Sequence, residues 1–252
     1  MPTPPPNTNA SPHEIDLHDR VAVVTGGGRG IGLAVTRALH ARGMRVHICG
    51  RSREHLQQAA AADPEGITFT VCDLADDDAP DRLFAAVRER HEHLYLLVNN
   101  AGLGVYDTVE QTALADWDRM LRVNARAAFA CAQAAFTHFR AHQTPARIVN
   151  IGSVVSHKGY VNQAGYTASK HALLGWTKVL AREGQAHGIR CAAVCPGGVA
   201  TDMVAQARPD LDPQGLIQPV DVARAVVYLA TEPETCCTDQ LNLRRSGSTP
   251  FG

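Results

Sequence analysis

The chain has 252 residues, of which 45% are hydrophobic and 19% charged, and its formal net charge is −1. This composition is typical of a globular protein, and it lacks the basic excess of proteins that bind nucleic acid. No apolar run approaches the roughly 20 residues that span a bilayer, and the N-terminus has no secretory pattern, so we expect a cytoplasmic protein without nucleic-acid or membrane partners.

The first segment of the chain differs in composition from the rest. Residues 1–18 are rich in Pro, Asn, Ser and Thr and cannot bury enough apolar surface to become ordered, so a flexible tail is predicted. The remainder, residues 19–252, is predicted to form a single domain, because α/β domains of roughly 200 to 250 residues are routine.

Short apolar runs alternate with longer helical patterns from residue 20 onward. Such alternation predicts a parallel sheet with helices on both faces, the doubly wound Rossmann type of α/β fold. The expected strand order, 3-2-1-4-5-6-7, places a ligand crevice at the carboxyl ends of the first and fourth strands. The predicted strands cover residues 21–25, 45–49, 67–71, 94–98, 147–151, 189–194 and 239–243.

A glycine-rich turn joins the first strand to the first helix in "VAVVTGGGRGIGLAVTRAL". Gly26, Gly30 and Gly32 would permit a tight turn, close approach to a pyrophosphate and close helix packing, while the helix N-terminus offers free N–H donors. The alternative is a glycine-rich turn that binds nothing. The strand before it and the helix after it favour a dinucleotide-binding site.

The end of the second strand, "HICGRSREHL", bears on the choice of cofactor. An acid at this point would bind the 2′-hydroxyl of NAD, but Gly50 and Arg51 stand there instead, and Arg29 lies in the glycine turn. An arginine fork suits a phosphate dianion, so NADP(H) is predicted in preference to NAD(H). The alternative is that Arg51 and Arg53 simply face solvent.

Histidine and cysteine form no metal-binding pattern. The seven cysteines contain no CxxC pair and most lie in apolar stretches, where reduced thiols pack as small hydrophobes. His91 and His93 end a helical pattern without a second group of ligands. No metal site is predicted.

The segment "GYTASKHALLG" places Tyr166 and Lys170 one helical turn apart. The pair is either an ordinary surface pair or a phenol tuned for proton transfer. Lowering a tyrosine pKa from about 10 to near 7 requires on the order of 4 kcal/mol, part of which a neighbouring ammonium can supply. The cofactor loop and a nearby hydroxyl favour the second interpretation.

Together these motifs resemble the short-chain dehydrogenase/reductase family over about residues 20–243. The matching pieces are "TGGGRGIG" (25–32), "CDL" (72–74), "NNAG" (99–102), Asn124, "IGS" (151–153), "YTASK" (166–170) and "PGGVATDM" (196–203). The segment around Gln163 is similar to the 3-oxoacyl reductase and ketoreductase branch.

The resemblance implies four catalytic residues. Ser153 would bind the substrate carbonyl, Tyr166 would act as general acid/base, and Lys170 would assist it. Asn124 would fix a water leading from Lys170 to solvent, although a helix asparagine making a local contact is an alternative.

Further residues are implied as cofactor contacts, although each also fits ordinary turn chemistry. Asp73 resembles the residue that accepts from the adenine amino group. The full set is Gly26, Arg29, Gly30, Ile31, Gly32, Arg51, Asp73, Leu74, Asn99, Asn100, Ala101, Gly102, Tyr166, Lys170, Pro196, Gly197, Val199 and Thr201.

Substrate choice is expected to depend on residues 154–163 and on a loop at about 197–218, whose Arg208 could meet an acidic substrate or face solvent. The family commonly pairs the helices that carry Asn124 and Tyr166, so a homodimer or homotetramer is expected. The C-terminal stretch "CTDQLNLRRSGSTPFG" departs from the family's glycine-rich tail, which puts the tetramer contact in doubt.

The predicted function is NADP(H)-dependent reduction of a small ketone or aldehyde to an alcohol, or the reverse reaction. Two alternatives keep the fold and the cofactor: a cofactor-binding regulator, and a redox-neutral isomerase or dehydratase. The sequence identifies neither the substrate nor the stereochemistry.

Overall fold

The computed structural model describes residues 14–207 and 211–250. Most of the predicted tail, residues 1–13, and Arg208 therefore lie outside the described residues. The end of that tail is attached to the domain, because Leu17 is 2% exposed and the Ile15 N–H donates to Thr231 O at 2.9 Å.

Seven parallel strands form one sheet in the order β3-β2-β1-β4-β5-β6-β7, which confirms the predicted topology. Strand ends differ from the predicted ones by up to two residues, the usual uncertainty of a boundary. The strands are β1 (Val21–Thr25), β2 (Arg45–Gly50), β3 (Ile67–Val71), β4 (Leu96–Asn99), β5 (Ala146–Ile151), β6 (Ile189–Pro196) and β7 (Gln240–Leu243).

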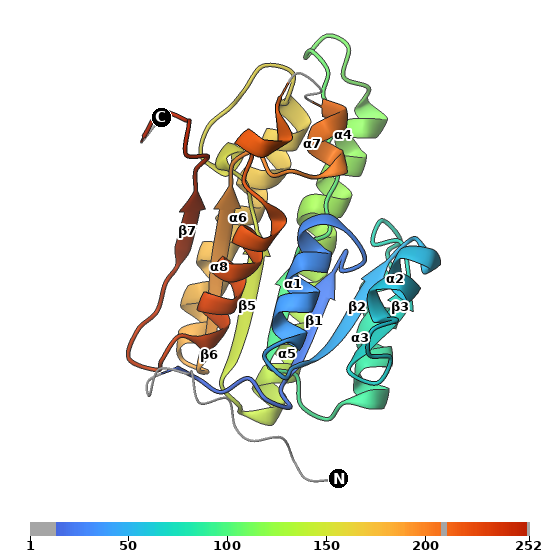
Figure 1. Ribbon diagram of the computed structural model, residues 1–252, viewed down its shortest axis with the longest axis vertical. Coiled ribbons are helices and arrows are strands. Elements are labelled where there is room, and N and C mark those ends of the chain that lie inside the picture. The colour runs from blue at the N-terminus through green and yellow to red at the C-terminus, as the bar shows by residue number, and fades with distance from the viewer. Residues whose placement is uncertain (1–13, 208–210, 251–252) are drawn as a thin grey trace.

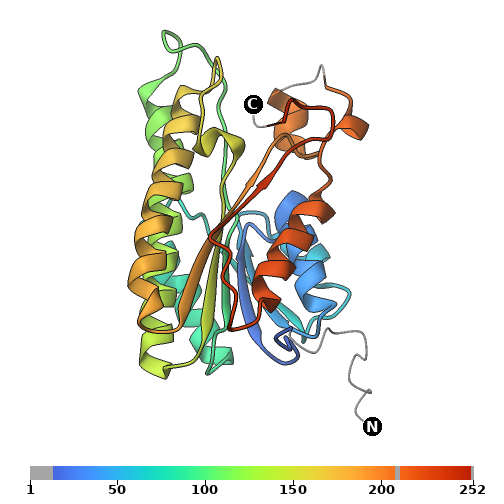
Figure 2. The same cartoon turned by 90° about the vertical axis from the view of Figure 1, so that its left-hand side faces the viewer.

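Helices cover both faces of the sheet (Figures 1 and 2). On one face lie α1 (Gly30–His40), α2 (Arg53–Ala60) and α8 (Pro219–Thr231). On the other lie α3 (Ala79–Arg90), α5 (Ala128–His142) and α6 (Ala164–Gln185). The remaining elements are α4 (Leu114–Leu121), η1 (Arg122–Ala127), η2 (Val154–Ser156), α7 (Asp202–Ala207) and η3 (Pro213–Gly215).

The alternating side chains of the strands divide the core into two clusters. On β1, Ala22 and Val24 pack against the α1, α2 and α8 layer, whereas Val21 and Val23 pack against the α3, α5 and α6 layer. Because both faces are buried, the β1 side chains are apolar in succession rather than alternately polar. Polar loop residues are therefore left for the two ends of the sheet.

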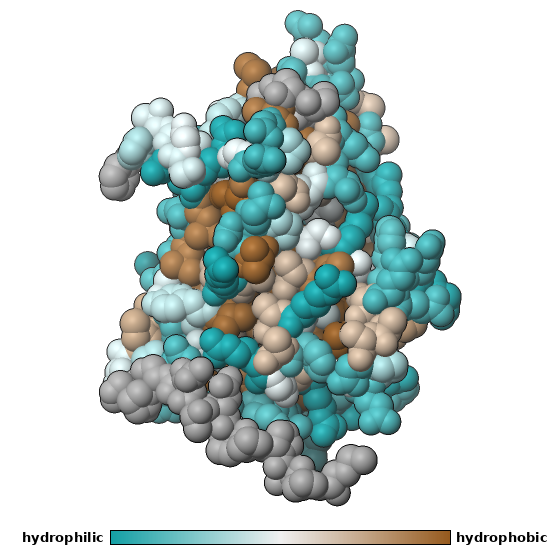
Figure 3. Space-filling model, viewed as in Figure 1, coloured by the Kyte–Doolittle hydropathy of each residue, from teal (hydrophilic) through white to brown (hydrophobic). Residues whose placement is uncertain are grey.

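Surface composition agrees with this layering. On the face drawn in Figure 3, hydrophilic side chains surround scattered apolar patches. None of the helices within the described residues is both long and apolar enough to cross a bilayer.

Gly32 fixes how closely α1 packs on the end of β1. A Cβ at this position would lie 2.1 Å from Gly26 O and 2.5 Å from Asn100 Nδ2, distances that require the backbone to move. Gly26 itself has φ of 65°, a left-handed conformation that glycine adopts readily.

We therefore expect Gly32→Ala to lower the free energy of unfolding by about 1–3 kcal/mol, the usual cost of overpacking. Urea unfolding followed by circular dichroism measures this change. The matched control is Gly215→Ala, since a Cβ there has nothing within 4 Å, and its effect should stay within about 0.5 kcal/mol. Equal stability of both variants would contradict the packing argument.

Candidate active site

A cleft of about 590 Å³ opens at the carboxyl ends of β1, β2, β3, β4, β5 and β6. The glycine turn forms one part of it, and Ser153, Tyr166 and Lys170 form another. The structure brings to this one cleft every predicted site residue except Asn99 and Asn124.

The glycine turn leaves the first N–H groups of α1 directed outward from the sheet. Its N-cap residue, Arg29, has extended backbone and no side-chain cap, so the helix start keeps donors for a ligand. Arg29 Nη1 also lies 3.5 Å from Asp202 Oδ2 at the start of α7. Thr201 approaches the same turn, since a Cβ on Gly30 would lie 3.4 Å from Thr201 Cγ2. The loop after β6 thus meets the glycine turn across the cleft.

Thr25 and Asn100 join the ends of β1 and β4. The Thr25 hydroxyl accepts from the N–H groups of Asn100 and Ala101, both at 3.0 Å, and the Asn100 amide donates to Thr25 O at 2.9 Å. This places the backbone of Ala101 and Gly102 at the cleft.

Asn99, which was predicted to touch the cofactor, points elsewhere. Its side chain is 2% exposed and donates to Ala128 O at 3.0 Å and to Asn150 Oδ1 at 2.9 Å, between the sheet and α5. Successive residues of a strand point to opposite faces, so Asn100 faces the cleft and Asn99 faces the core.

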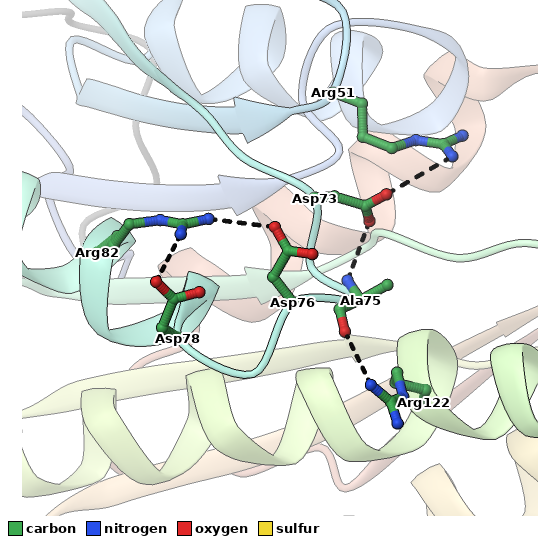
Figure 4. Close-up of polar contacts among 7 residues, drawn as sticks. All are labelled: Arg51, Asp73, Ala75, Asp76, Asp78, Arg82 and Arg122. Carbon is green, nitrogen blue, oxygen red and sulfur yellow. Dashed lines mark hydrogen bonds and ion pairs between the residues drawn. The ribbon is translucent and has the colours of Figure 1, made fainter.

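Arg51 and Asp73 lie together where β2 and β3 end (Figure 4). Arg51 Nη1 is 3.9 Å from Asp73 Oδ2, too long for a hydrogen bond, and both side chains are more than one third exposed. Asp73 is oriented by the Ala75 N–H, which donates to its Oδ1 at 3.0 Å. The carbonyl of Ala75 accepts from Arg122 on η1 at 3.5 Å. The arginine fork is thus exposed and near an acid, but not held by it.

Ser153, Tyr166 and Lys170 come from two elements that follow β5. Ser153 caps η2, where its Oγ accepts from Val155 N at 3.3 Å, and Tyr166 and Lys170 share α6. Lys170 Nζ lies 5.8 Å from the centre of the Tyr166 ring and donates to Ile151 O at 2.8 Å. Lys170 is only 4% exposed, so the pair is not an ordinary surface pair.

The electrostatics of this group differ from the sequence-based expectation. Burial raises the pKa of the Tyr166 phenol, the adjacent Tyr106 raises that pKa further, and a hydrogen bond with Ser153 opposes the rise. Burial also lowers the pKa of Lys170 to about 8. Desolvation therefore outweighs the ammonium, which is directed at Ile151 O, and the phenol is held in its protonated form.

Asn124 is fully buried in the π-helical turn η1 between α4 and α5. Its Oδ1 accepts from Leu103 N at 2.9 Å, while its Nδ2 donates to Leu103 O at 2.8 Å and to Ser169 Oγ at 3.0 Å. The contact is therefore long-range rather than local: the amide ties the segment after β4 to α6. The predicted role in fixing a water stays a prediction.

Some cleft residues were missed by the sequence analysis. Ser52, the N-cap of α2, and His55 line the cleft beside Arg51. Both could have been found from their place just after a strand end, where an N-cap signal occurs. Met203 and Val204 of α7 also line the cleft, and they belong to the loop at about 197–218 on which substrate choice was expected to depend.

Within residues 14–207 and 211–250, no three His, Cys, Asp or Glu side chains are arranged to hold a metal ion. All seven cysteines are free thiols, five of them buried and two, Cys236 and Cys237, exposed. Among the groups that line the cleft are the hydroxyl of Ser153, the phenol of Tyr166 and the ammonium of Lys170.

Comparison with known proteins agrees with this geometry. A family model described as short chain dehydrogenase matches residues 20–212. The 3-oxoacyl-[acyl-carrier-protein] reductase MabA of Mycobacterium tuberculosis is 34% identical over 84% of this chain and 86% of that protein.

Two solved structures share the fold and much of the sequence. The actinorhodin polyketide ketoreductase with NADPH has a TM-score of 0.83 at 32% identity, covering 90% of this chain and 96% of that one. A putative NAD(P) dependent gluconate 5-dehydrogenase from Beutenbergia cavernae with bound NADP has a TM-score of 0.82 at 32% identity, with the same coverage. The chain therefore belongs to the short chain dehydrogenase family of oxidoreductases.

Proposed function

We propose that this protein is an NADPH-dependent carbonyl reductase that converts a small or medium ketone or aldehyde to an alcohol. The observation that carries the proposal is the presence of Ser153, Tyr166 and Lys170 in the same cleft as the glycine turn. Relatives named as reductases of carbonyl groups, MabA and the actinorhodin ketoreductase, support the direction.

The residues divide the proton chemistry among them. Ser153 would donate a hydrogen bond to the carbonyl oxygen and orient it for attack. Tyr166 would donate its proton to that oxygen, and a phenol kept protonated by burial suits this role. Lys170 has a pKa near 8, so it is mostly charged at pH 7 and would stabilise the phenolate that remains.

A dinucleotide fits the residues that line the rest of the cleft. The cradle at Gly26, Gly30 and Gly32 has no side chains, and the open end of α1 offers N–H donors to a pyrophosphate. When bound, NADPH supplies the hydride. Arg51 and Ser52 would hold the 2′-phosphate, since no carboxylate occupies the end of β2 to bind a ribose hydroxyl.

We predict that Tyr166→Phe lowers kcat for carbonyl reduction by roughly 10²–10⁴-fold, because the ring remains but the proton donor is lost. NADPH binding, followed by its fluorescence, should be retained. Tyr228→Phe on α8, which is 49% exposed, is the matched control and should leave kcat unchanged. A fully active Tyr166→Phe enzyme, or a wild-type protein that binds NADPH but oxidises it with no carbonyl in a broad panel, would refute the proposed reaction.

We predict that Arg51→Ala weakens NADPH binding about tenfold or more while leaving NADH binding almost unchanged, because only NADPH carries the phosphate that the guanidinium would bind. The neighbouring Arg53→Ala is the matched control, since Arg53 is exposed and does not line the cleft. Titration of both cofactors measures the difference. Equal losses for the two cofactors would show that Arg51 does not select NADPH.

The exposed face of α5 and α6 supports a dimer. Phe129, 45% exposed, stacks edge-on against Trp176 at 5.7 Å, and Val179 is 54% exposed beside them along α6. An acidic side chain, Asp118, and a basic one, Arg126, line a hollow of about 490 Å³ on this face. A surface that carries apolar groups together with both charges can pair with a second copy of itself about a two-fold axis.

Phe129→Asp should therefore dissociate the dimer to monomers, because it would bury two unpaired carboxylates at the interface. Sedimentation velocity measures the change. Val109→Asp, at a position 79% exposed on the loop before α4, is the control and should remain dimeric. A dimer that survives Phe129→Asp would place the interface elsewhere.

A further inference from the structure

Tyr106 lies directly beside the proposed acid, and the reaction described above does not use it. It belongs to the loop between β4 and α4. The centres of the Tyr106 and Tyr166 rings are 5.9 Å apart, with an angle of 55° between the rings. Tyr106 is partly exposed and lies against Tyr166, which lines the cleft, as does Leu103 of the same loop.

The loop segment just before Tyr106 is held by contacts with η1 and α4. The Asn124 side chain accepts from the Leu103 N–H at 2.9 Å and donates to the Leu103 carbonyl at 2.8 Å. The Val105 N–H donates to Met120 Sδ at 3.4 Å. The backbone just before the tyrosine is thus fixed to η1 and α4. The buried Asn124 therefore helps to fix the position of the Tyr106 ring, because it holds the backbone three residues earlier.

Gly104 makes the position of the ring possible. A Cβ on Gly104 would lie 2.5 Å from the Tyr106 hydroxyl oxygen and 2.7 Å from its Cζ. The aromatic ring therefore folds back over a residue that has no side chain, and any larger residue at position 104 would displace it.

The contact between the two rings makes Tyr106 one of four side chains that surround the Tyr166 phenol. Ser153 approaches it from η2, Lys170 from its own helix, Cys195 from β6 and Tyr106 from the loop after β4. Lys170 is the cation of this group, and burial raises the pKa values of Cys195 and Tyr106, which keeps both neutral near pH 7. Near pH 7 Tyr106 thus contributes ring surface and no charge, whereas at alkaline pH its ionised hydroxyl would raise the pKa of Tyr166.

We propose that Tyr106 is a positioning and specificity residue of this enzyme: its ring shields the Tyr166 phenol from water and limits the size of the group attached to the reacting carbonyl. The favoured substrates are then carbonyl compounds with a slender substituent on this side, rather than fused-ring ketones. The proposal rests on the proposed carbonyl reduction for its substrate part. The shielding of Tyr166 can be measured without turnover.

The kinetic test uses Tyr106→Ala and Tyr106→Phe with ethyl acetoacetate as the small ketone and 1-tetralone as the bulky one. We expect Tyr106→Ala to raise the ratio of kcat/KM for 1-tetralone to that for ethyl acetoacetate about tenfold. Reduction needs protonated Tyr166 and charged Lys170, and Lys170, with a pKa of about 8, loses its proton first as pH rises. The pKa of Tyr166 is therefore measured by titration rather than from the pH profile of turnover, and admitting water, which favours the phenolate, should lower it in Tyr106→Ala.

Tyr106→Phe keeps the ring and should keep the wild-type substrate ratio. Gly104→Ala pushes the ring away without altering it and should shift the substrate ratio in the direction of Tyr106→Ala. Thermal melting and NADPH affinity establish that each variant is folded. Should Tyr106→Ala fail to fold, Tyr106→Leu replaces it in every assay.

A second measurement needs no substrate. Tyrosinate absorbance is titrated in the wild type and in Tyr166→Phe, and the difference between the two curves isolates Tyr166. The same difference should appear at lower pH in the Tyr106→Ala background than in the Tyr106→Phe background, which also lacks the ionisable hydroxyl but keeps the ring. Equal midpoints in these two backgrounds would overturn the shielding role. An unchanged substrate ratio in Tyr106→Ala, or the same ratio in Tyr106→Phe and Tyr106→Ala, would overturn the size limit. A wild-type protein that oxidises NADPH with no carbonyl in the broad panel would overturn the proposed function, and the substrate limit with it, while the titration would still decide the shielding.

Discussion

The burial of both faces of a parallel sheet is the constraint on which the rest of the structure depends. With α1, α2 and α8 on one face and α3, α5 and α6 on the other, most strand side chains are apolar and close-packed, and buried polar ones such as His47 and Asn150 are hydrogen-bonded to other side chains. Polar groups that can meet a ligand lie at the strand ends. Because all seven strands are parallel, their carboxyl ends meet along one edge, and segments distant in sequence form a single cleft there.

The same constraint explains how much could be predicted from the sequence. Strand positions and order follow from apolar runs alternating with helical patterns, and the glycine turn and the Tyr166–Lys170 spacing are local features. Side-chain direction at a strand end is a different matter. Asn99 and Asn100 are adjacent and chemically identical, yet one lies between the sheet and α5 and the other at the cleft. Choosing between them requires the register of β4 against β5, which a single sequence does not reveal.

Electrostatics was the least predictable part, because a charge acts through the environment of its neighbour as well as through distance. The helical spacing correctly implies that Lys170 lies near Tyr166, at 5.8 Å from the ring centre. It does not reveal that both groups are packed among β5, β6 and the loop after β4, where desolvation raises one pKa and lowers the other. In such a site the pKa values of the phenol and the ammonium move apart, so Tyr166 stays protonated while Lys170 remains mostly charged near pH 7.

The buried amide of Asn124 connects the packing of the helices to the arrangement of the cleft. Asn124 interrupts the α4–α5 helix as a π-helical turn, and π-helical turns are frequent at functional sites although they weaken the regular hydrogen-bond pattern. In exchange, its amide makes three hydrogen bonds that join the loop after β4 to α6, the helix that carries Tyr166 and Lys170. The loop that carries Tyr106 is thereby coupled to the helix that carries Tyr166. Asn124 makes this link although its own side chain is fully buried and does not line the cleft.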